Sequence, residues 1–217
     1  IEDFLKNILD IFLDTNKTII FPSFISTTFK NKIIDLDRAK SISGVLSEKF
    51  RNIKGVERTL SPFFSYCSLG KRTREFTELN PLHEWGEGSS LAWIEKNNAT
   101  CIILGSYAEN NPLVHRVEYK ERNLIRYREL LKYCNNVNYK GKKIEHIQYF
   151  LSKKRGFVQN NYKGFLTKYN NFNIRKYRHK EFLIYKYVAK DFIDIFKKEL
   201  LSNEYYRHGH RQKINNI

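Results

Sequence analysis

Two side chains with complementary chemistry, His115 and Glu118, stand three positions apart in a segment with helical character. At that spacing the two side chains occupy the same face of a helix. A carboxylate beside an imidazole fixes the tautomer of the ring and stabilises the imidazolium that forms when the ring takes a proton. A free imidazole has a pKa of about 6.5 and is mostly neutral near pH 7. The pair therefore predicts a general base; the alternative reading is an ordinary surface His–Glu pair.

The elements that must position this pair follow the alternation of an α/β layered domain. Residues 100–105 (TCIILG) form the clearest buried-strand pattern, and the Asn-Asn-Pro sequence at 110–112 opens the helix that contains the pair. Ligands of α/β folds gather near the carboxyl edge of such strands. Upstream segments repeat the alternation, with helical spacing at 4–13 and 39–51, a strand at 18–21 that Pro22 ends, and a strand at 62–70.

The second half of the chain has a different pattern. Two strand-like stretches, residues 125–133 and 143–151, are joined by a turn-rich sequence at 138–141 and predict a hairpin. Residues 152–180 lack clean periodicity and indicate long loops. A last helix is expected over 188–203, with an apolar face opposite its lysines, and the end of the chain is expected to fray.

Charge divides the chain in the same way. The net charge is +16; residues 1–118 hold 15 basic and 15 acidic residues, whereas residues 119–217 hold 24 and 8. A strongly cationic half predicts contact with phosphate or another anion, and the alternative is that its lysines are only solvated. No apolar run approaches the length needed to cross a bilayer. Three widely spaced cysteines (Cys67, Cys101, Cys134) fit neither a disulfide framework nor a metal knuckle, and a reducing cytoplasm is the default location.

Other candidate motifs carry weaker signals. The six histidines show no metal-ligand spacing, so no metal site is expected, and His83 stays open as a catalytic candidate. No GxSxG, Walker loop or GxGxxG is present. The glycine-rich loop at 86–90 opens a helix, a geometry that can hold an anion on backbone N–H groups.

Several segments in order resemble the aminoglycoside 3-N-acetyltransferase family. The family pattern combines an R-S/T-x-H-P-x-x-S-F-x-x-x-G stretch, an F-G-E-G-S loop, an L-L-G strand and an H-x-x-E-Y motif. In this chain, residues similar to those four motifs follow in the same order at 58–70, 84–89, 103–105 and 115–119. Two further similar stretches lie upstream, at 20–24 and 44–48. The resemblance spans roughly residues 4–133.

The resemblance implies a coenzyme A-dependent N-acyltransferase with a three-layer α/β/α fold and a mixed central sheet. His115 would be its catalytic base and Glu118 the acidic partner, and acetyl-CoA would be the co-substrate. The expected coenzyme contacts are Ser43, Gly44, Arg58 and Ser65. The whole chain, 1–217, would be one acyltransferase domain: 1–118 the coenzyme and catalytic part, 119–205 the basic acceptor side, and 206–217 a frayed tail.

Two departures from the family pattern affect these expectations. Family members begin with a V-x-V-H-S-S-L-S-like strand and loop that contributes to the coenzyme site, and we expect that N-terminal strand to be missing here. Ser61 stands where aminoglycoside-modifying members often have His before Pro.

The acceptor is expected to be an amino sugar. Because aminoglycosides are polycations, a chain with this charge would attract them poorly. A nucleotide-linked amino sugar, with its pyrophosphate on basic residues that include Arg122, Arg126 and Arg128, is therefore the favoured acceptor, and Glu87 is also expected to bind substrate. An aminoglycoside antibiotic is the alternative. From another class, a nucleic-acid-binding module is the rival, since aromatic residues, Tyr127 and Tyr162 among them, interleave with the basic ones and could stack on bases, although no module signature is present.

Overall fold

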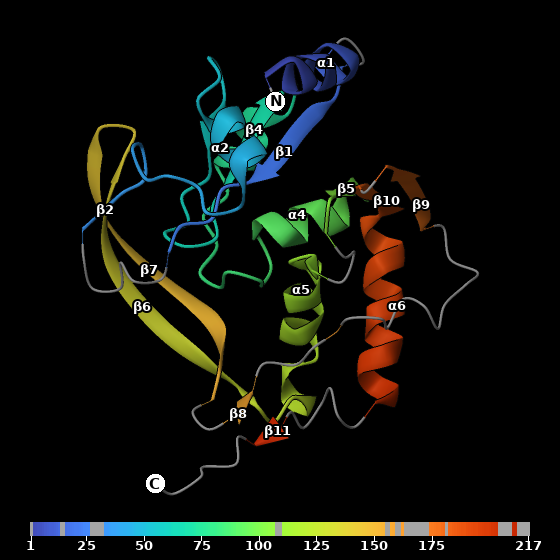
Figure 1. The fold of residues 1–217 in the computed structure, drawn as a ribbon. Helices are drawn as coiled ribbons and strands as arrows, with labels where there is room; N and C mark the ends of the chain where they lie inside the picture. Colours follow the sequence, from blue (N-terminus) through green and yellow to red (C-terminus); the bar gives the residue numbers. More distant parts are fainter. Residues whose placement is uncertain are drawn as a thin grey trace, which may run out of the picture. The chain divides into compact units, whose positions relative to one another are not determined.

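The fold is mixed α/β (Figure 1). The computed structural model describes residues 2–13, 16–26, 33–106, 110–154, 157–158, 162, 174–180, 182–203 and 210–211. The chain divides into two compact units: the first unit contains Ile1–Glu84, Gly88–Ser90 and Lys132–Tyr149, and the second contains Trp85–Glu87, Leu91–Leu131 and Phe150–Ile217. This division does not test whether residues 1–217 form one acyltransferase domain, so the single domain stays a prediction. No helix among the described residues combines the length and apolar character needed to cross a membrane.

The first unit is built on two small sheets. Its elements are α1 (Glu2–Leu13), β1 (Thr18–Pro22), β2 (Ile34–Asp35), α2 (Val45–Arg51), β3 (Glu57–Arg58), β4 (Tyr66–Gly70), α3 (Thr73–Thr77) and most of β6 (Arg128–Tyr139) and β7 (Lys142–Lys153). One sheet has the order β1-β4-β3 with antiparallel neighbours. The other has the order β2-β6-β7, in which β2 runs parallel to β6.

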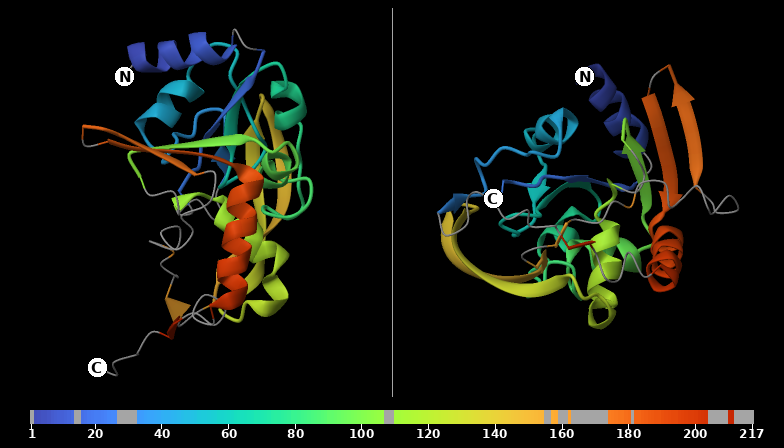
Figure 2. Two further views of the ribbon diagram at one scale, coloured as in Figure 1. Left: turned by 90° about the vertical axis from the view of Figure 1, so that its right-hand side faces the viewer. Right: turned by 60° about the horizontal axis from the view of Figure 1, so that its bottom comes forward.

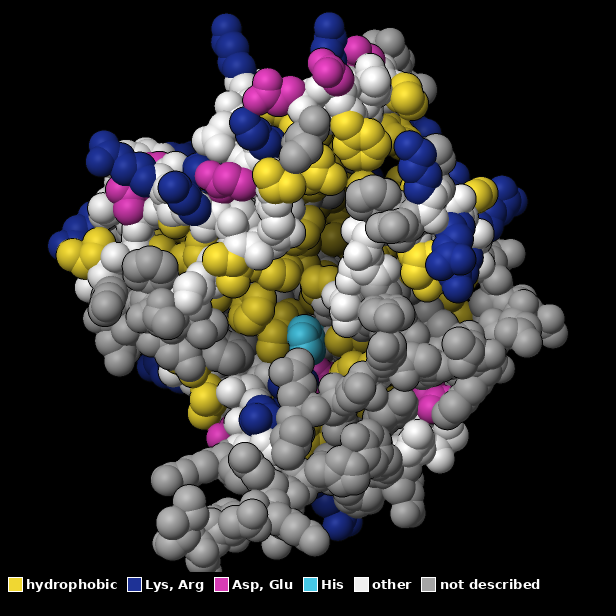
Figure 3. Space-filling view, in the orientation of Figure 1, with side chains coloured by type: hydrophobic (Ala, Val, Ile, Leu, Met, Phe, Trp, Pro, Cys, Tyr) yellow, Lys and Arg dark blue, Asp and Glu magenta, His cyan; other side chains and the backbone are white. Residues whose placement is uncertain are grey.

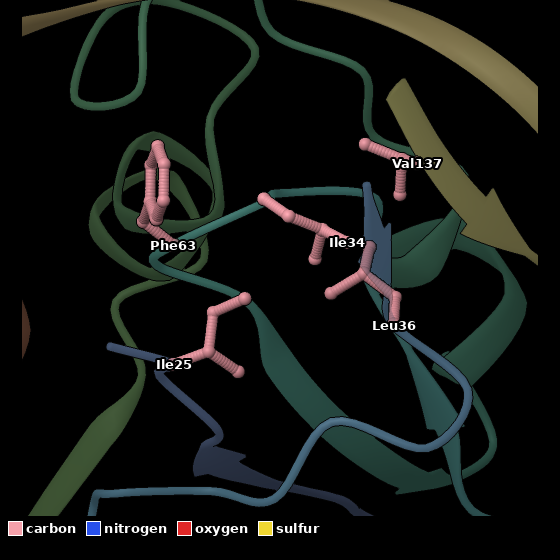
Figure 4. Packing of buried hydrophobic residues seen from close by; sticks show 5 residues of the cluster. All are labelled: Ile25, Ile34, Leu36, Phe63 and Val137. Carbon is pink, nitrogen blue, oxygen red and sulfur yellow. The ribbon is translucent and has the colours of Figure 1, made fainter. Parts of the chain in front are cut away.

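Apolar packing holds this unit together. Five side chains from β2, β6 and the loops between strands form one buried cluster (Figure 4): Ile25, Ile34, Leu36, Phe63 and Val137. A glycine is required where β4 ends, because a Cβ at Gly70 would collide with the carbonyl oxygen of Lys17 and its φ is +124°. The close approach at Gly70 holds the end of β4 against the residue before β1. Two predicted coenzyme residues lie at strand ends of this sheet, since Arg58 ends β3 and Ser65 directly precedes β4.

The second unit combines an antiparallel sheet with two packed helices. Its elements are most of α4 (Ser90–Lys96), β5 (Thr100–Leu104), α5 (Leu113–Lys120), the 3-10 turn η3 (Arg122–Leu124), β8 (Phe157–Val158), β9 (Arg175–His179), β10 (Phe182–Val188), α6 (Ala189–Ser202) and β11 (His210–Arg211). The sheet has the order β5-β10-β9. Helix α6 packs beside α5 (Figure 2) and buries one apolar face through Phe192, Ile195, Phe196 and Leu200.

Many of the expected elements are present. The opening helix, the strand that Pro22 ends, the strand at 100–104, the helix with the His–Glu pair and the last helix are all confirmed. The hairpin is also confirmed, although its first strand begins at Arg128. It turns at Lys140 and Gly141, which both have positive φ, as a two-residue hairpin of right-handed twist requires.

Three boundaries or environments were wrong. The helix expected over 39–51 begins only at Val45, because Gly44 has φ +109° and the Ser41–Ser43 segment makes local side-chain hydrogen bonds; Ile42 is 66% exposed. The strand expected over 62–70 begins at Tyr66. The strand at 100–104 is present but half-open, with Ile102 46% exposed, since β-branched residues suit a pleated strand whether or not it is buried.

The long loops expected over 152–180 are partly wrong. Residues 175–179 form β9, a strand with a polar sequence that exists because it pairs with β10 across a turn at Lys180. In the tail, where fraying was expected, His210–Arg211 pair with β8 as the short strand β11. The rest of the tail, and most of 155–173, lie outside the described residues.

Candidate active site

Helix α5 brings the predicted catalytic pair together. The Nδ1 atom of His115 lies 2.7 Å from Oε2 of Glu118. The Glu118 side chain is fully buried, whereas that of His115 is 23% exposed. The carboxyl group therefore anchors an imidazole that still reaches the surface of its unit.

The sequence before α5 explains why the helix starts where it does. The Oδ1 atom of Asn111 accepts a hydrogen bond from the backbone N–H of Leu113 at 2.9 Å, which satisfies one of the free donors of the first turn. The amide nitrogen of Asn111 donates to the hydroxyl of Tyr187 on β10. Leu113, Val114 and Val117 form the buried face of the helix. Asn111 thus joins the N-terminal end of α5 to β10.

The second oxygen of Glu118 has its own set of donors. Oε1 accepts hydrogen bonds from the hydroxyl of Tyr127 at 2.5 Å and from the hydroxyl of Tyr162. Arg128 contributes Nη2 at 3.0 Å and Nε at 3.3 Å. Because Oε2 is used by His115, both oxygens of this carboxyl group are occupied.

These partners decide the charge of the cluster. Burial by itself raises the pKa of Glu118, but the hydrogen bond with His115 and the positive charge of Arg128 outweigh it and hold the pKa at about 2. An ionised carboxylate only accepts hydrogen bonds, so the neutral imidazole carries its proton on Nδ1. Nε2 is then the ring nitrogen with the lone pair, and it is the atom that can take a proton from a substrate.

A tryptophan and a buried arginine support the imidazole. The ring of Trp85 stacks on that of His115 with centroids 4.8 Å apart. Arg116 donates to the carbonyl oxygen of Trp85 at 2.9 Å, to Glu87 at 2.5 Å and to Glu95 of α4 at 2.7 Å. One side chain that is 3% exposed therefore fixes the loop that carries the stacking ring.

The three predicted substrate residues lie at the surface of the second unit. The side chain of Glu87 is 86% exposed, and its Oε1 is held by Arg116. The guanidinium of Arg122 lies over the ring of Tyr119, 4.5 Å from its centroid, and donates to the carbonyl of the same residue. Arg126 is exposed. Their contact with a substrate stays a prediction.

The predicted coenzyme residues meet in the first unit, around the loop that follows β1. Ser43 accepts a hydrogen bond from the backbone N–H of Phe24 at 3.0 Å. Ser65 donates to the carbonyl of Ser23 at 2.6 Å, and Arg58 donates to the same carbonyl. Three of the four residues thus contact this short loop. The fourth, Gly44, is exposed beside Ser43.

Arg58 and Ser65 are nevertheless buried. The guanidinium of Arg58 donates to the carbonyls of Leu36 and Ala39 and to Ser65 Oγ, each at 2.8 Å, as well as to Ser23. Burial among these uncharged acceptors lowers the pKa of Arg58 to about 10. These contacts tie Arg58 and Ser65 to the backbone around the loop. Contact of the four residues with a coenzyme stays a prediction.

A second buried carboxyl group, Glu84, lies in the first unit. It accepts a hydrogen bond from Ser61 Oγ at 2.7 Å, and its backbone N–H donates to the carbonyl of Tyr149 at 2.8 Å. Burial raises its pKa to about 8, and the hydrogen bonds with Ser61 and Gln148 lower it only in part. Sequence reasoning gave Glu84 no role.

His83, the other histidine considered as a catalytic candidate, lies in the first unit. The ring of His83 lies 5.2 Å from that of Tyr149, with which it forms an isolated bridge in the first unit. Within the described part of the chain, no group of three or more His, Cys, Asp or Glu side chains could hold a metal ion. On the face drawn in Figure 3, Lys and Arg side chains lie at several separate places, some of them beside Asp or Glu.

Sequence reasoning missed the side chains that surround the pair. Tyr127 and Arg128 were considered only as stacking or phosphate-binding residues of the basic half, and Tyr162 lies 44 positions beyond Glu118. Trp85 was noted only within a motif. One general rule could have indicated them: a buried carboxylate needs hydrogen-bond donors. The rule predicts which types of residue surround Glu118 but not their positions in the sequence.

The chain matches the sequence profile of the aminoglycoside 3-N-acetyltransferase family over residues 9–184, and it belongs to that family. No curated protein sequence matches it.

Solved structures with the same fold support this placement. AAC-IIIb in binary complex with CoASH is 18% identical with a TM-score of 0.68, over 85% of this chain and 77% of that one. The YokD protein from Bacillus subtilis is 17% identical with a TM-score of 0.72, over 92% and 84%. AAC-VIa bound to sisomicin is 13% identical with a TM-score of 0.72, over 92% and 85%. At these identities the likeness shows the fold.

Family membership confirms the expected class of enzyme. The chain is an acyl-CoA-dependent N-acetyltransferase, with acetyl-CoA as its co-substrate. The nucleic-acid-binding module considered for the basic half gives way to this assignment. Between the two expected acceptors, the comparisons favour the aminoglycoside alternative over the nucleotide-linked amino sugar.

Proposed function

We propose that this enzyme transfers the acetyl group of acetyl-CoA to an amino group of an aminoglycoside-type amino sugar, with His115 as general base and Glu118 as its acidic partner. One observation carries the proposal: a partly exposed imidazole whose Nδ1 is held at 2.7 Å by a fully buried carboxylate. This is the arrangement that directs the basic lone pair of the ring outward from the carboxylate.

The chain's own groups account for the proton. Acetyl-CoA supplies an activated thioester carbonyl. The Nε2 atom of His115 takes a proton from the acceptor nitrogen as its lone pair forms the new N–C bond. The C–S bond breaks, and the same proton passes from Nε2 to the departing sulfur. The imidazolium exists only between these transfers, and Glu118 stabilises it with a full negative charge at hydrogen-bond distance.

Glu87 in the second unit supports a cationic acceptor. The carboxyl of Glu87 is exposed beside the loop of Trp85, and Arg116 fixes one of its oxygens. An ammonium group of an aminoglycoside would find an oriented carboxylate there. AAC-VIa bound to sisomicin and a mutant of AAC(3)-IVa in complex with a gentamicin, both of this fold, have aminoglycosides as their bound molecules.

The nucleotide-linked amino sugar is the second candidate acceptor, supported by the net charge of the basic half. Arg128 was one of the residues expected to meet its pyrophosphate, but its guanidinium is committed to buried Glu118. Arg122 and Arg126 remain exposed for that role. The argument from charge is therefore weaker than the sequence suggested.

A thiol-release assay with acetyl-CoA tests the proposal on both acceptor classes, using sisomicin and a nucleoside-diphosphate amino sugar. We expect turnover with sisomicin, and His115→Ala should lower kcat by about 10²- to 10⁴-fold with acetyl-CoA binding unchanged in calorimetry. Turnover of the nucleotide sugar alone would overturn the choice of acceptor. Normal turnover by His115→Ala would overturn the base.

Glu87→Gln tests the acceptor site separately. Loss of the carboxylate should raise the KM for sisomicin by about tenfold, because a charge-assisted contact is lost, while the KM for acetyl-CoA stays constant. The exposed carboxyl of Glu129 on β6 provides the matched control, Glu129→Gln. An equal effect of both substitutions would mean that only the net charge matters.

A further inference from the structure

We propose that Tyr127, Tyr162 and Arg128 act together as positioning residues that keep Glu118 ionised and in one orientation, so that the proton taken during the reaction stays on His115. The inference rests on the proposed function of the pair. It adds three residues that the activity of the family does not by itself assign.

The two oxygens of Glu118 have separate partners, which is the first observation. Within the described part of the chain, Oε2 has the imidazole as its hydrogen-bond partner, whereas Oε1 receives the two phenol hydroxyls and two nitrogens of the guanidinium. A carboxyl group held at both oxygens cannot rotate about its terminal bond without breaking several hydrogen bonds. The direction of the Oε2 lone pair toward His115 is therefore fixed before substrate arrives.

The protons of the cluster point to the same role. The hydroxyl oxygens of Tyr127 and Tyr162 lie 2.6 Å apart, and both are within hydrogen-bond distance of Oε1. Two phenolic protons are thus available to three oxygens. The strongest hydrogen bonds form when both hydroxyls donate to the ionised carboxylate, because it carries the negative charge. Burial and the nearby charge of Glu118 raise the pKa of both phenols, so neither takes over the negative charge.

The residues come from separate segments that converge on α5. Arg128 begins β6 and Tyr127 directly precedes it, and the backbone carbonyl of Tyr127 accepts a hydrogen bond from the N–H of Lys154 at 2.8 Å. Tyr162 packs edge-on against Phe196 of α6, with ring centroids 4.9 Å apart. Each donor is thereby held in place by an element other than the helix that carries Glu118.

The charge balance gives Arg128 a specific effect. Glu118 and Arg128 form a buried pair with side-chain exposures of 0% and 7%, so protonation of His115 leaves a net charge of +1. Near α5, Glu95 of α4 pairs with Arg116 and Lys120, and Lys197 of α6 pairs with Glu121. Arg128 contacts Glu118 directly, so its positive charge opposes an early, unproductive protonation of the base.

Removing a donor from Oε1 should make the carboxylate more basic and the imidazole easier to protonate. For Arg128→Gln we expect the acid limb of the kcat/KM profile to move up by about one pH unit, with a roughly tenfold lower kcat and an unchanged KM for acetyl-CoA. For Tyr127→Phe the same limb should move by about half a unit, because one neutral donor is lost.

The closing experiment follows the imidazole directly in the free protein. The ¹⁵N NMR signals of His115 are titrated in the wild type, Arg128→Gln, Arg128→Lys, Tyr127→Phe and the Tyr127→Phe/Tyr162→Phe double variant. Arg178→Gln and Tyr177→Phe are matched controls, since both residues are exposed on β9. The titration midpoint should rise in the Gln and Phe variants, return most of the way in Arg128→Lys, and stay constant in the controls.

Each outcome decides one question. Unchanged midpoints in Arg128→Gln and in the double variant, with kcat reduced, would mean that these residues only support the fold, and the inference would be overturned. If Arg128→Gln does not fold, a midpoint that stays constant in the double variant alone overturns it. Shifted midpoints together with normal turnover by His115→Ala would instead leave the positioning intact and reject the proposed base.

Discussion

Two buried carboxyl groups, one in each unit, have pKa values that are shifted in opposite directions. Glu118 in the second unit is 0% exposed and Glu84 in the first is 3% exposed, so burial penalises their charged forms similarly. The pKa of Glu118 is nevertheless held at about 2, whereas that of Glu84 is raised to about 8. The difference lies in their partners. Glu118 faces a guanidinium, an imidazole and two phenols; Glu84 faces a serine hydroxyl and an amide.

The comparison shows which property distinguishes the proposed acid–base partner from another buried carboxyl group. Burial alone identifies both groups as unusual, but only Glu118 is connected to a side chain that reaches the surface. Glu84 is mostly protonated at neutral pH and holds backbone and side chains of its own unit together. Charge complementarity, rather than burial, separates the proposed catalytic partner from the structural one.

The largest effect that sharpens this contrast is expected for Glu118→Gln. The amide loses the negative charge that stabilises the imidazolium, so kcat should fall by about 10²- to 10³-fold, less than in His115→Ala. Steady-state kinetics with saturating acetyl-CoA measures it. Glu84→Gln, in which charge was already absent, is the matched comparison. A larger loss of kcat in Glu84→Gln than in Glu118→Gln would remove the distinction drawn between them.

The two carboxyl groups should also give opposite dependences of stability on pH. The folded-state pKa of Glu84 is raised from 4.5 to about 8, so between these values the folded state keeps a proton that the unfolded state releases, and stability falls as pH rises. From pH 5 to pH 8, Glu84→Gln should therefore gain roughly 3–4 kcal/mol of stability relative to the wild type. Urea unfolding at pH 5 and pH 8 checks this.

For Glu118 the sign is reversed. Its folded-state pKa is lowered from 4.5 to about 2, so its contribution is complete above pH 4.5 and is lost as pH falls toward 2. Glu118→Gln should flatten the stability curve on the acid side only. A change confined to the same side in both variants would contradict the assignment of charges.

The smallest expected effect is that of Ser61→Ala. The hydroxyl of Ser61 donates to Glu84 at 2.7 Å and accepts from the backbone N–H of Phe64. Its removal should lower the free energy of unfolding by about 1 kcal/mol and leave the KM values unchanged. Urea unfolding at pH 5 measures it. A loss of sisomicin turnover without a loss of stability would instead connect Ser61 to the acceptor.

The sequence predicted the contact between His115 and Glu118 because the information for that contact is local. Three positions on one helix put two side chains on the same face whatever surrounds them. The donors to Glu118 arrive from segments up to 44 residues away, and no periodicity encodes that meeting. The same reason explains β9, whose polar sequence becomes a strand only because β10 is its partner.

The predicted coenzyme residues illustrate an intermediate case. Motif order named Ser43, Arg58 and Ser65 as coenzyme residues, and the structure brings all three to one loop; their contact with the coenzyme stays a prediction. Motif order does not reveal burial, and Arg58 proves to be enclosed by backbone carbonyls. Packing decides which residues can touch a ligand and which support the backbone beneath it. The spacing of a motif does not encode packing.

Arg116 has a consequence for how this enzyme can change. A single enclosed guanidinium joins three points: the carbonyl of Trp85, the carboxyl of Glu87 and the carboxyl of Glu95. Replacement of that arginine would disturb all three together, whereas Glu87 can be exchanged for another residue while the other two points stay tied. With Glu87 as the proposed acceptor contact, a single substitution at this exposed position can change the acceptor preference. Arg116 has to be retained, because its loss would disturb all three contacts.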